Sequence, residues 1–303
     1  MMDKNDFQQK VTALLPEIEL RYFEPMAKHT SFRIGGPAEV MAFPKNTEEL
    51  SVILKTSKLL DCKTAILGAG TNVLAPDKGI SGLVVCLKDC MDGMSRMDAC
   101  HIRVSAGVSM ARAAVFAAGQ GLSGLEFAHG IPGTVGGGVY MNAGAYGGEI
   151  AQVCESVDVM SMDGRLTTYQ AADMDFSYRH SRLEDEQGIV VSAVFVLQQM
   201  PEEQIREQMR ELMSRRKASQ PLDLPSAGSA FKRPTGGYAA ALIDQAGLKG
   251  FQIGGAAVSK KHAGFVVNLG DATSADVLEL LKEVSDRVWK QSGIRLEPEV
   301  RIW

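Results

Sequence analysis

Residues Gly130–Gly148 read GIPGTVGGGVYMNAGAYGG, and the rest of the chain is best understood around them. The stretch holds eight glycines and one proline, and it contains no Asp, Glu, Lys or Arg. Such a density of glycine lets the backbone turn sharply and approach a ligand closely. Successive N–H groups in turns of this kind form concave sites for phosphate oxygens. Because Ile131, Val135 and Tyr146 give the stretch apolar anchors that a flexible linker lacks, we predict a buried loop that binds a ligand.

A second glycine-rich turn, Gly68–Val73 (GAGTNV), follows a short apolar strand expected at 63–67. Neither turn has the G-x-x-x-x-G-K-[ST] pattern of a P-loop. The second turn begins like the dinucleotide fingerprint, but Val73 stands where the third glycine belongs. Two such turns without either motif indicate a ligand with a diphosphate, held by something other than a Rossmann unit.

Length indicates the number of domains, and charge and hydrophobicity limit the kinds of partner. A chain of 303 residues favours two domains, each large enough for its own core. The net charge of −4 argues against nucleic acid as the main partner. The first ten residues, MMDKNDFQQK, have acids and no apolar core, so we expect no signal peptide and a cytoplasmic protein. The longest uncharged stretch includes the glycine-rich loop, which cannot span a bilayer as a helix, so we expect no membrane partner.

The five cysteines are an odd number and include no C-x-x-C pair. We expect them to be reduced and mostly buried, behaving as small hydrophobic residues. A zinc site is not expected.

Apolar periodicity and turn residues predict a mixed α and β chain. Before the loop we expect helices at 3–15, 47–60 and 109–118, and strands at 38–43, 63–67, 82–87 and 101–105. Asn46 and Glu49 have the spacing of a helix N-terminal cap. After the loop we expect a hairpin over 156–169, a strand at 189–197 and a charged helix over 201–216. The last hundred residues predict a loop at 225–234, helices at 239–246 and 273–293, and strands at 251–258, 264–269 and 294–303.

Three side chains are candidates for chemistry, each with a simpler alternative. Arg179 lies just before a strand, and its planar guanidinium could grip a carboxylate with two hydrogen bonds, although an ordinary loop arginine fits equally well. Ser229 lies in a proline-bounded loop that suits exposure into a cleft, but it has no G-x-S-x-G elbow and a turn serine is the simpler interpretation. Glu299 lies on the terminal strand, where a solvated acid is the simpler interpretation.

Other polar residues also allow two interpretations. His129, beside the glycine-rich loop, could contact a ligand or hold the loop by a hydrogen bond. Lys260, Lys261 and His262 could bind phosphate or form a solvated turn.

Taken together, several separated motifs resemble the UDP-N-acetylenolpyruvoylglucosamine reductases, also called UDP-N-acetylmuramate dehydrogenases. The resemblance covers nearly the whole chain and rests on the segments 67–74, 131–148, 177–181, 227–232 and 296–300. It implies an α+β fold: an FAD-binding domain of the vanillyl-alcohol and p-cresol oxidase type, made of two α+β subdomains, and a smaller α+β substrate-binding domain. We accordingly expect an N-terminal helix and lead-in over 1–25, the FAD-binding domain over 26–199 and the substrate-binding domain over 200–303.

The resemblance also implies residue roles. It makes Arg179, Ser229 and Glu299 the catalytic residues, with no metal. It implies non-covalent FAD at Gly68, Ala69, Gly70, Thr71, Asn72, Val73, His129, Ile131, Pro132, Gly133, Thr134, Gly136, Gly137, Asn142, Gly144 and Gly148. For the substrate we expect contacts from Tyr178, Lys232, Arg233, Lys261 and His262. NADPH is the expected reductant, and we expect a monomer.

The implied reaction reduces the enolpyruvyl ether of UDP-N-acetylglucosamine to UDP-N-acetylmuramate, a precursor of the bacterial cell wall. Hydride passes from NADPH to FAD and then to C3 of the enolpyruvyl group. Arg179, with Glu299, would stabilise the negative charge that develops at C2 and in the carboxylate. Ser229 would protonate C2 as the general acid, and Lys232 is a candidate to polarise its hydroxyl.

The sequence departs from the family pattern at a few positions. Gly138 stands where alanine is expected, and Arg233 stands where some members carry asparagine. The segment between Arg182 and Ile189 is too short for the tyrosine-bearing loop of one subclass, so the chain resembles the loop-lacking second type. Two other functions stay open: an FAD-dependent oxidase of an alcohol or sugar on the same fold, and a non-catalytic regulator that binds flavin or a UDP-sugar.

Overall fold

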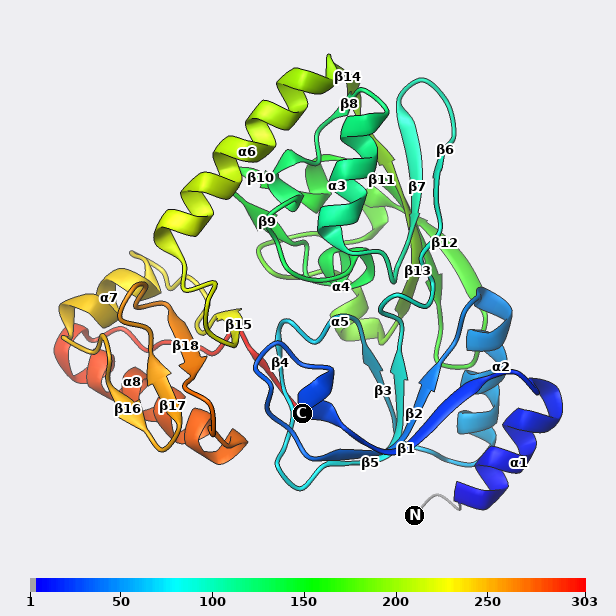
Figure 1. Cartoon of the computed structure of the whole chain (residues 1–303), viewed down its shortest axis with the longest axis horizontal. Coiled ribbons are helices and arrows are strands. Elements are labelled where there is room, and N and C mark those ends of the chain that lie inside the picture. Colours follow the sequence, from blue (N-terminus) through cyan, green and yellow to red (C-terminus); the bar gives the residue numbers. More distant parts are fainter. Residues whose placement is uncertain (1–3) are drawn as a thin grey trace. The chain divides into compact units, whose positions relative to one another are not determined.

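The computed structural model describes residues 4–303, which form two compact units. Unit 1 comprises the chain up to Tyr22 together with Val40–Ala69 and Ser81–Arg215. Unit 2 comprises Phe23–Glu39, Gly70–Ile80 and Arg216–Trp303. The N-terminal half of the chain therefore contributes two short segments to the unit that is otherwise built by the last 88 residues, 216 to 303 (Figure 1).

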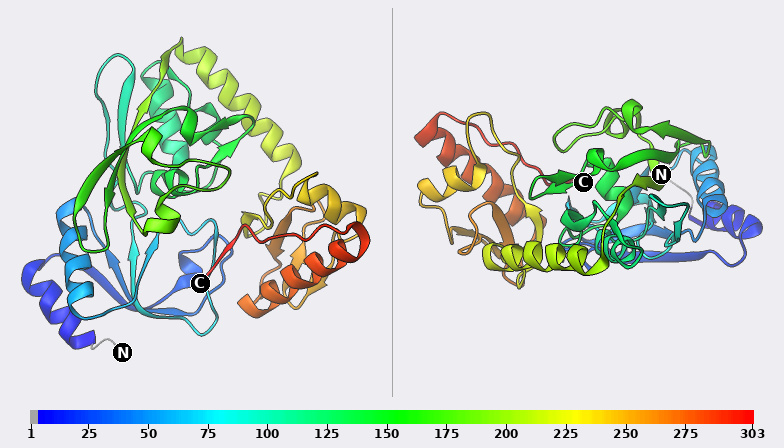
Figure 2. Two further views of the ribbon diagram at one scale, coloured as in Figure 1. Left: turned by 180° about the vertical axis from the view of Figure 1, so that it is seen from behind. Right: turned by 90° about the horizontal axis from the view of Figure 1, so that it is seen from above.

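An antiparallel sheet of five strands forms the centre of unit 1, in the order β12-β11-β13-β7-β6. The strands are β6 (Met94–Arg96), β7 (His101–Ser105), β11 (Cys154–Met160), β12 (Leu166–Gln170) and β13 (Ile189–Val196). The left view of Figure 2 shows the broad green strands of this sheet side by side. Central β13, IVVSAVFV, is buried at every position but its last, as expected for a strand covered on both faces. Helices α3 (Met110–Gly119) and α4 (Val135–Tyr140) contribute Ala114, Val135 and Val139 to the same core.

A second sheet has four strands in the order β1-β2-β5-β3. They are β1 (Glu19–Pro25), β2 (Pro37–Phe43), β3 (Thr64–Leu67) and β5 (Ile80–Cys86), and β3 pairs with β5 in parallel. Helices α1 (Lys4–Leu14) and α2 (Thr47–Leu59) pack against each other beside it through buried Phe7, Val11 and Leu50 (Figure 1). The predicted cap of α2 is confirmed, because the Asn46 side chain accepts the Glu49 N–H at 2.8 Å.

Unit 2 has an antiparallel sheet in the order β15-β18-β17-β16 with two helices. Its elements are β15 (Ser226–Ser229), α7 (Ala239–Gln245), β16 (Gln252–Ile253), β17 (Ala256–Val258), β18 (Phe265–Asn268) and α8 (Ser274–Ser292). Helix α8 buries Val277, Leu281 and Val288 on one face. It begins at a capping box formed by Thr273 and Asp276 and ends at Gly293, which has a φ of 69°. Both predicted ends of this helix are confirmed.

Asp77 fixes the 70–80 segment within unit 2. Its carboxylate accepts the Ser274 N–H at 2.8 Å and the Ser274 Oγ–H at 2.7 Å, at the first turn of α8. In the same unit, β4 (Val73–Leu74) pairs in parallel with β19 (Arg301–Ile302). These contacts explain why a segment close to residue 75 in sequence belongs to the C-terminal unit.

The remaining elements are short apart from one helix. They are η1 (Met26–Lys28), β8 (Leu122–Ser123), η2 (Glu126–Ala128), β9 (Gly144–Ala145), β10 (Gly148–Glu149), η3 (Ile150–Gln152), η4 (Ala171–Asp173), α5 (Leu183–Glu186), β14 (Gln198–Gln199) and α6 (Glu202–Ser219). Within residues 4–303, no helix combines the length and the apolar character that a membrane span requires.

Four predicted elements were wrong in detail. The glycine-rich stretch is not a loop throughout, because Val135–Tyr140 form α4. The expected loop at 225–234 contains β15, and the single strand expected at 251–258 is two strands joined by a turn. The final strand shrinks to Arg301–Ile302, because Pro298 has no N–H for a ladder and pairs only through an isolated bridge to Phe231. Strand β1 was not predicted.

The five cysteines are free thiols, but only Cys86 and Cys154 are fully buried. Burial raises the pKa of Cys154 to about 12. Burial, with a smaller contribution from Cys86, raises the pKa of Cys90 to about 11. The thiolate is the reactive form, so both thiols are predicted to be poor nucleophiles.

We therefore predict slow alkylation of Cys90 in the folded protein. At pH 8 a thiol of pKa about 11 has a thiolate fraction near 0.001, roughly 100-fold below that of a thiol of pKa 9.0. Iodoacetamide labelling at pH 8, quantified by peptide mass spectrometry, should modify Cys90 at least ~10-fold more slowly than in denaturant. Equal rates in the two states would contradict the prediction.

Candidate functional site

Gly68, at the start of one glycine-rich turn, meets Thr134 of the other inside unit 1. A Cβ placed on Gly68 would lie 2.6 Å from the Thr134 Oγ1, so only glycine permits this approach. Thr134 begins α4, where its hydroxyl accepts the Gly137 N–H at 3.4 Å. It is bridged to Ser109, the N-terminal cap of α3, by the bonds Met110 N–H to Gly133 O and Val135 N–H to Val108 O. The starts of two helices and the end of β3 are thus brought together.

Several of the predicted cofactor glycines face protein. A Cβ on Gly136 would lie 2.9 Å from the Ala106 Cβ, and one on Gly148 would lie 2.6 Å from the Phe127 ring. Gly144 is equally close to the Glu149 Cβ, at 2.8 Å. Gly137 is exposed. As cofactor contacts these four glycines stay predictions, and the structure gives the first three a packing role.

Unpaired backbone donors and a buried imidazole suit this part of unit 1 to an anionic ligand. The N–H groups of Gly68, Ala69, Gly133 and Thr134 have no hydrogen-bond acceptor among residues 4–303. The Nδ1 of His129 is buried and has no hydrogen-bond partner among the residues that the structure describes. Burial also lowers the pKa of the His129 imidazole. Free N–H groups at a turn bind phosphate oxygens. The residues therefore fit the diphosphate of a dinucleotide such as FAD.

Histidine titration tests this description of the ring environments. Burial lowers the pKa of His129 and of His262 below the ordinary 6.5, whereas the hydrogen bond that the His101 ring donates to the Asp98 carboxylate raises the pKa of His101 above it. Between the folded pKa of His129 and 6.5 the unfolded chain binds more protons, so this histidine lowers stability as the pH falls. The contribution of His101 is present below 6.5 and is lost as the pH rises through its folded pKa. NMR titration of these three histidines should give a midpoint above 6.5 for His101 and midpoints below 6.5 for His129 and His262. The reverse order would contradict the structure.

Arg179 lies in a tight turn of unit 1. Ser177 and His180 exchange backbone hydrogen bonds of 3.2 Å in each direction, and Arg179 between them has a φ of 57°. Its guanidinium lies over the Tyr178 ring, 5.0 Å from the centroid, and donates to Gly144 O at 3.4 Å. Tyr178, the predicted substrate contact, is 51% exposed, and Arg179, the predicted catalytic residue, is half-buried beside it.

Ser229 and Glu299 lie on adjoining segments of unit 2. Gly228, with a φ of 76°, forms an irregularity in the pairing of β15 with β18, and Ser229 follows it as an exposed residue. Such a bulge redirects the side chains next to it. The next residue, Ala230, accepts the Glu299 N–H through its carbonyl at 2.9 Å. The structure therefore brings together the segments that carry Ser229 and Glu299, which are 70 positions apart.

The glycine-rich turn at 70–73 supports the Glu299 segment from the other side. Asn72 Nδ2 donates to Glu299 O at 3.2 Å, and Asn72 O accepts the Arg301 N–H at 2.9 Å. Val73 pairs with Arg301 in the β4–β19 ladder, and Thr71 is half-buried. Asn72 was predicted as a cofactor contact, and this second function in bracing Glu299 had no signal in the sequence.

The other predicted substrate contacts lie in unit 2 with partners of their own. Lys232 Nζ is 4.0 Å from the Glu297 carboxylate, and it makes no hydrogen bond to Ser229. Lys261 Nζ donates to Lys217 O at 2.6 Å. Arg233 lies over the Tyr238 ring at 4.3 Å from its centroid. His262 Nδ1 accepts the Gly264 N–H at 3.1 Å, which leaves its Nε2 as the protonated donor of the neutral ring.

The predicted site residues are divided between the two units. Ile131 packs on the core of unit 1, and Pro132 is exposed. Arg179 thus belongs to unit 1, whereas Ser229 and Glu299 belong to unit 2. Among residues 4–303, no cluster of three His, Cys, Asp or Glu side chains is placed to hold a metal ion.

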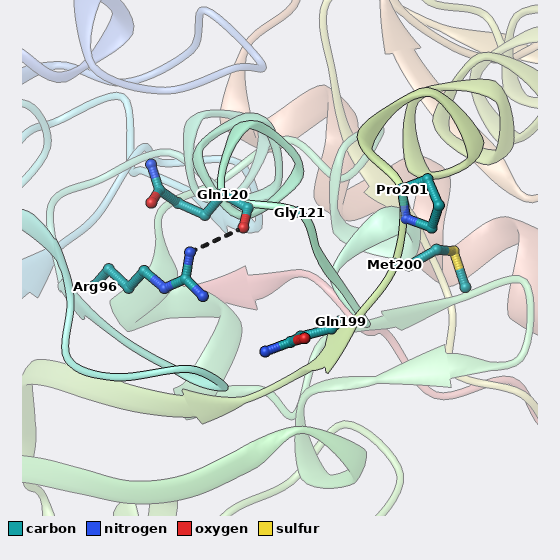
Figure 3. Close-up of a pocket in the computed structure, with 6 residues that line it drawn as sticks. All are labelled: Arg96, Gln120, Gly121, Gln199, Met200 and Pro201. Atoms are coloured by element: carbon teal, nitrogen blue, oxygen red, sulfur yellow. Dashed lines mark hydrogen bonds between the residues drawn. The ribbon is translucent and has the colours of Figure 1, made fainter.

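A surface pocket in unit 1 lies apart from these residues. It is lined by Arg96, Gln120, Gly121, Gln199, Met200 and Pro201 (Figure 3). The Arg96 guanidinium donates to three backbone carbonyls, of Asp98, Ala99 and Gln120. These bonds tie β6 to the end of α3 and hold the Arg96 side chain in place.

Comparison with known proteins gives two family matches. Residues 38–170 match an FAD binding domain, and residues 220–303 match the C-terminal domain of UDP-N-acetylenolpyruvoylglucosamine reductase. The reductase of that name from Agathobacter rectalis is 47% identical over 98% of both chains. The one from Caldanaerobacter subterraneus is 45% identical over 97% of this chain and 96% of its own.

Solved structures agree with these sequence matches. The crystal structure of UDP-N-acetylenolpyruvylglucosamine reductase from Thermus caldophilus has a TM-score of 0.80 at 36% identity, covering 95% of this chain and 99% of that one. Berberine bridge enzyme shares only the fold, with a TM-score of 0.52 at 14% identity over 67% of this chain and 45% of its own. The predicted fold class, an FAD-binding domain of this oxidase type followed by a smaller α+β domain, is confirmed.

Proposed function

Since the chain belongs to the UDP-N-acetylenolpyruvoylglucosamine reductase family, we propose that it uses NADPH and FAD to reduce the enolpyruvyl ether of UDP-N-acetylglucosamine to UDP-N-acetylmuramate. Two features support the proposal: the match to an FAD binding domain at 38–170 and the free N–H donors at Gly68, Ala69, Gly133 and Thr134. These donors would hold the FAD diphosphate. The chemistry that bound FAD supplies is hydride transfer, first from NADPH and then to C3 of the enolpyruvyl group.

The observation that carries the catalytic assignment is that Ser229 and Glu299 lie on adjoining segments, which are joined by a backbone hydrogen bond. Addition of hydride to C3 converts the C2–C3 double bond into a single bond and leaves the electron pair at C2, conjugated with the carboxylate. Arg179, with Glu299 nearby, would stabilise that charge. Ser229 would deliver a proton to C2. The Glu299 N–H bond to Ala230 O fixes the backbone beside Ser229, so the two side chains start from neighbouring points.

The proposal assigns FAD binding to 26–199 and substrate binding to 200–303, with Tyr178, Lys232, Arg233, Lys261 and His262 as substrate contacts. We also propose a cytoplasmic monomer, since NADPH and nucleotide sugars are cytoplasmic metabolites. Sedimentation equilibrium should then give a mass near 32.6 kDa, and a mass of twice that value would contradict the monomer.

An anaerobic titration tests the function. NADPH should bleach the bound flavin, and the enolpyruvyl sugar nucleotide should restore its absorbance with formation of one UDP-N-acetylmuramate per flavin. Acid precipitation should leave the yellow colour in the supernatant, because the cofactor is non-covalent. If only oxygen restores the absorbance and the sugar nucleotide does not, the protein is an oxidase of the same fold instead.

A further inference from the structure

The turn that carries Arg179 is short, and Ser177 and Tyr178 in it are exposed. It closes through the two 3.2 Å backbone bonds between Ser177 and His180. Arg179 takes a left-handed φ of 57°, which is unfavourable for a residue with a Cβ, and Tyr178 is 51% exposed. A short exposed turn with a strained residue keeps one geometry only when its surroundings hold it.

Asn142 supplies one such contact from the glycine-rich stretch. Its side chain is almost completely buried, with 1% of the residue exposed. The Nδ2 donates to Ser177 O at 3.0 Å, and the Oδ1 accepts the Ala151 N–H at 2.9 Å. The Asn142 side chain therefore joins Ser177, the first residue of the Arg179 turn, to Ala151 in η3.

Ser181 supplies a second contact from the other end of the turn. It is completely buried, and its Oγ–H donates to Tyr140 O at 2.7 Å. Both bonds reach the short stretch 140–142, at the end of α4. The turn is thus anchored at both ends to one segment, and the Arg179 guanidinium donates to Gly144 O just beyond it.

We propose that Asn142, together with Ser181, is a positioning residue that holds Arg179 in its working geometry. The inference rests on the proposed function, since it takes Arg179 as the group that stabilises charge in the substrate. Loss of the anchor would leave the guanidinium present but displaced, and a displacement of about 1 Å costs on the order of 100-fold in rate. It also replaces the expected role of Asn142 as a cofactor contact, because a side chain that is 1% exposed with both amide atoms bonded to backbone has little surface for a ligand.

Asn142→Asp is the sharpest variant. It keeps the volume and the acceptor for the Ala151 N–H, but it replaces the donor to Ser177 O by an oxygen. In the holoenzyme we expect the FAD content and the rate of bleaching by NADPH to stay unchanged, and reoxidation by the enolpyruvyl sugar nucleotide to slow by about 10- to 100-fold. Hydrogen exchange of residues 175–181, measured on the protein without substrate, should accelerate because the turn has lost an anchor.

A double-mutant cycle and a matched control separate positioning from general destabilisation. Asn142→Asp should slow reoxidation little further when Arg179→Ala is already present, because both act through the same guanidinium. Asn46→Ala removes an asparagine of the same unit that also bonds backbone, at the cap of α2. It should lower the melting temperature without changing reoxidation or the exchange of 175–181. Ser181→Ala tests the same anchor if Asn142→Asp does not fold.

The outcomes are distinct. Loss of FAD from Asn142→Asp would make Asn142 a cofactor contact and overturn the inference. Unchanged reoxidation, or a loss fully additive with Arg179→Ala, would overturn it as well. If Arg179→Ala itself reoxidises at the wild-type rate, the catalytic assignment of Arg179 fails. If the wild type is not reoxidised by the sugar nucleotide at all, the proposed function fails.

Discussion

Ser229→Ala is expected to bind FAD and to be reduced by NADPH as the wild type is, but to be reoxidised by the enolpyruvyl sugar nucleotide at least ~100-fold more slowly. The reason is that only the second half of the reaction needs a proton at C2. Ser229 is exposed at the end of β15, directly before Ala230, which is bonded to the Glu299 segment. Stopped-flow absorbance of the flavin under anaerobic conditions separates the two half-reactions.

Ser226→Ala provides the matched control, since Ser226 lies on the same strand, three residues earlier. Its removal should change neither half-reaction. Ser229→Cys keeps an ionisable proton at the same position and should fall between the wild type and Ser229→Ala. Equal reoxidation rates for Ser229→Ala and the wild type would remove Ser229 from the role of general acid.

The sequence predicts the elements whose signals are local. Helices α2 and α8 have apolar residues at helical spacing and capping residues at their ends, so their limits follow from the sequence nearly to the residue. Strand β13 is apolar at every position but Ser192, and the hairpin of β11 and β12 has Asp163-Gly164 at its turn. Local chemistry was sufficient in all these cases.

The rest depends on contacts between distant residues. Helix α4 contains Gly136, Gly137 and Gly138, which are poor helix formers, and it is stable because Thr134 caps it and two of these glycines pack on Ala106 and Met110. The sequence alone could not show that Ser229 and Glu299 lie on adjoining segments. The bonds from Asn72 to Glu299 and from Asn142 to Ser177 likewise join residues 227 and 35 positions apart.

Gly70→Ala is expected to destabilise unit 2 by about 2–5 kcal/mol, the sum of about 1–2 for a left-handed residue with a Cβ and about 1–3 for overpacking. Gly70 has a φ of 61°, and an added Cβ would lie 2.1 Å from His29 O and 2.9 Å from the Thr30 Cα. The obstacle is backbone, so it cannot move aside as a side chain would. The Ser31 N–H, which donates to Gly70 O at 3.0 Å, holds the two segments at this distance.

Gly247→Ala separates the cost of the left-handed conformation from the cost of overpacking. Gly247 has a similar φ of 68°, but no atom lies within 4 Å of an added Cβ. The variant should cost only the conformational part, about 1–2 kcal/mol, and leave activity unchanged. Gly70→Ala should cost more and also slow flavin reoxidation, since the turn it distorts carries Asn72, whose Nδ2 bonds Glu299 O. Chemical denaturation of both variants, with flavin reoxidation measured alongside, gives the comparison. An equal loss of stability in Gly70→Ala and Gly247→Ala would contradict the prediction. It would mean that the close approach of Gly70 to His29 adds no cost and that the turn can shift to accept a side chain.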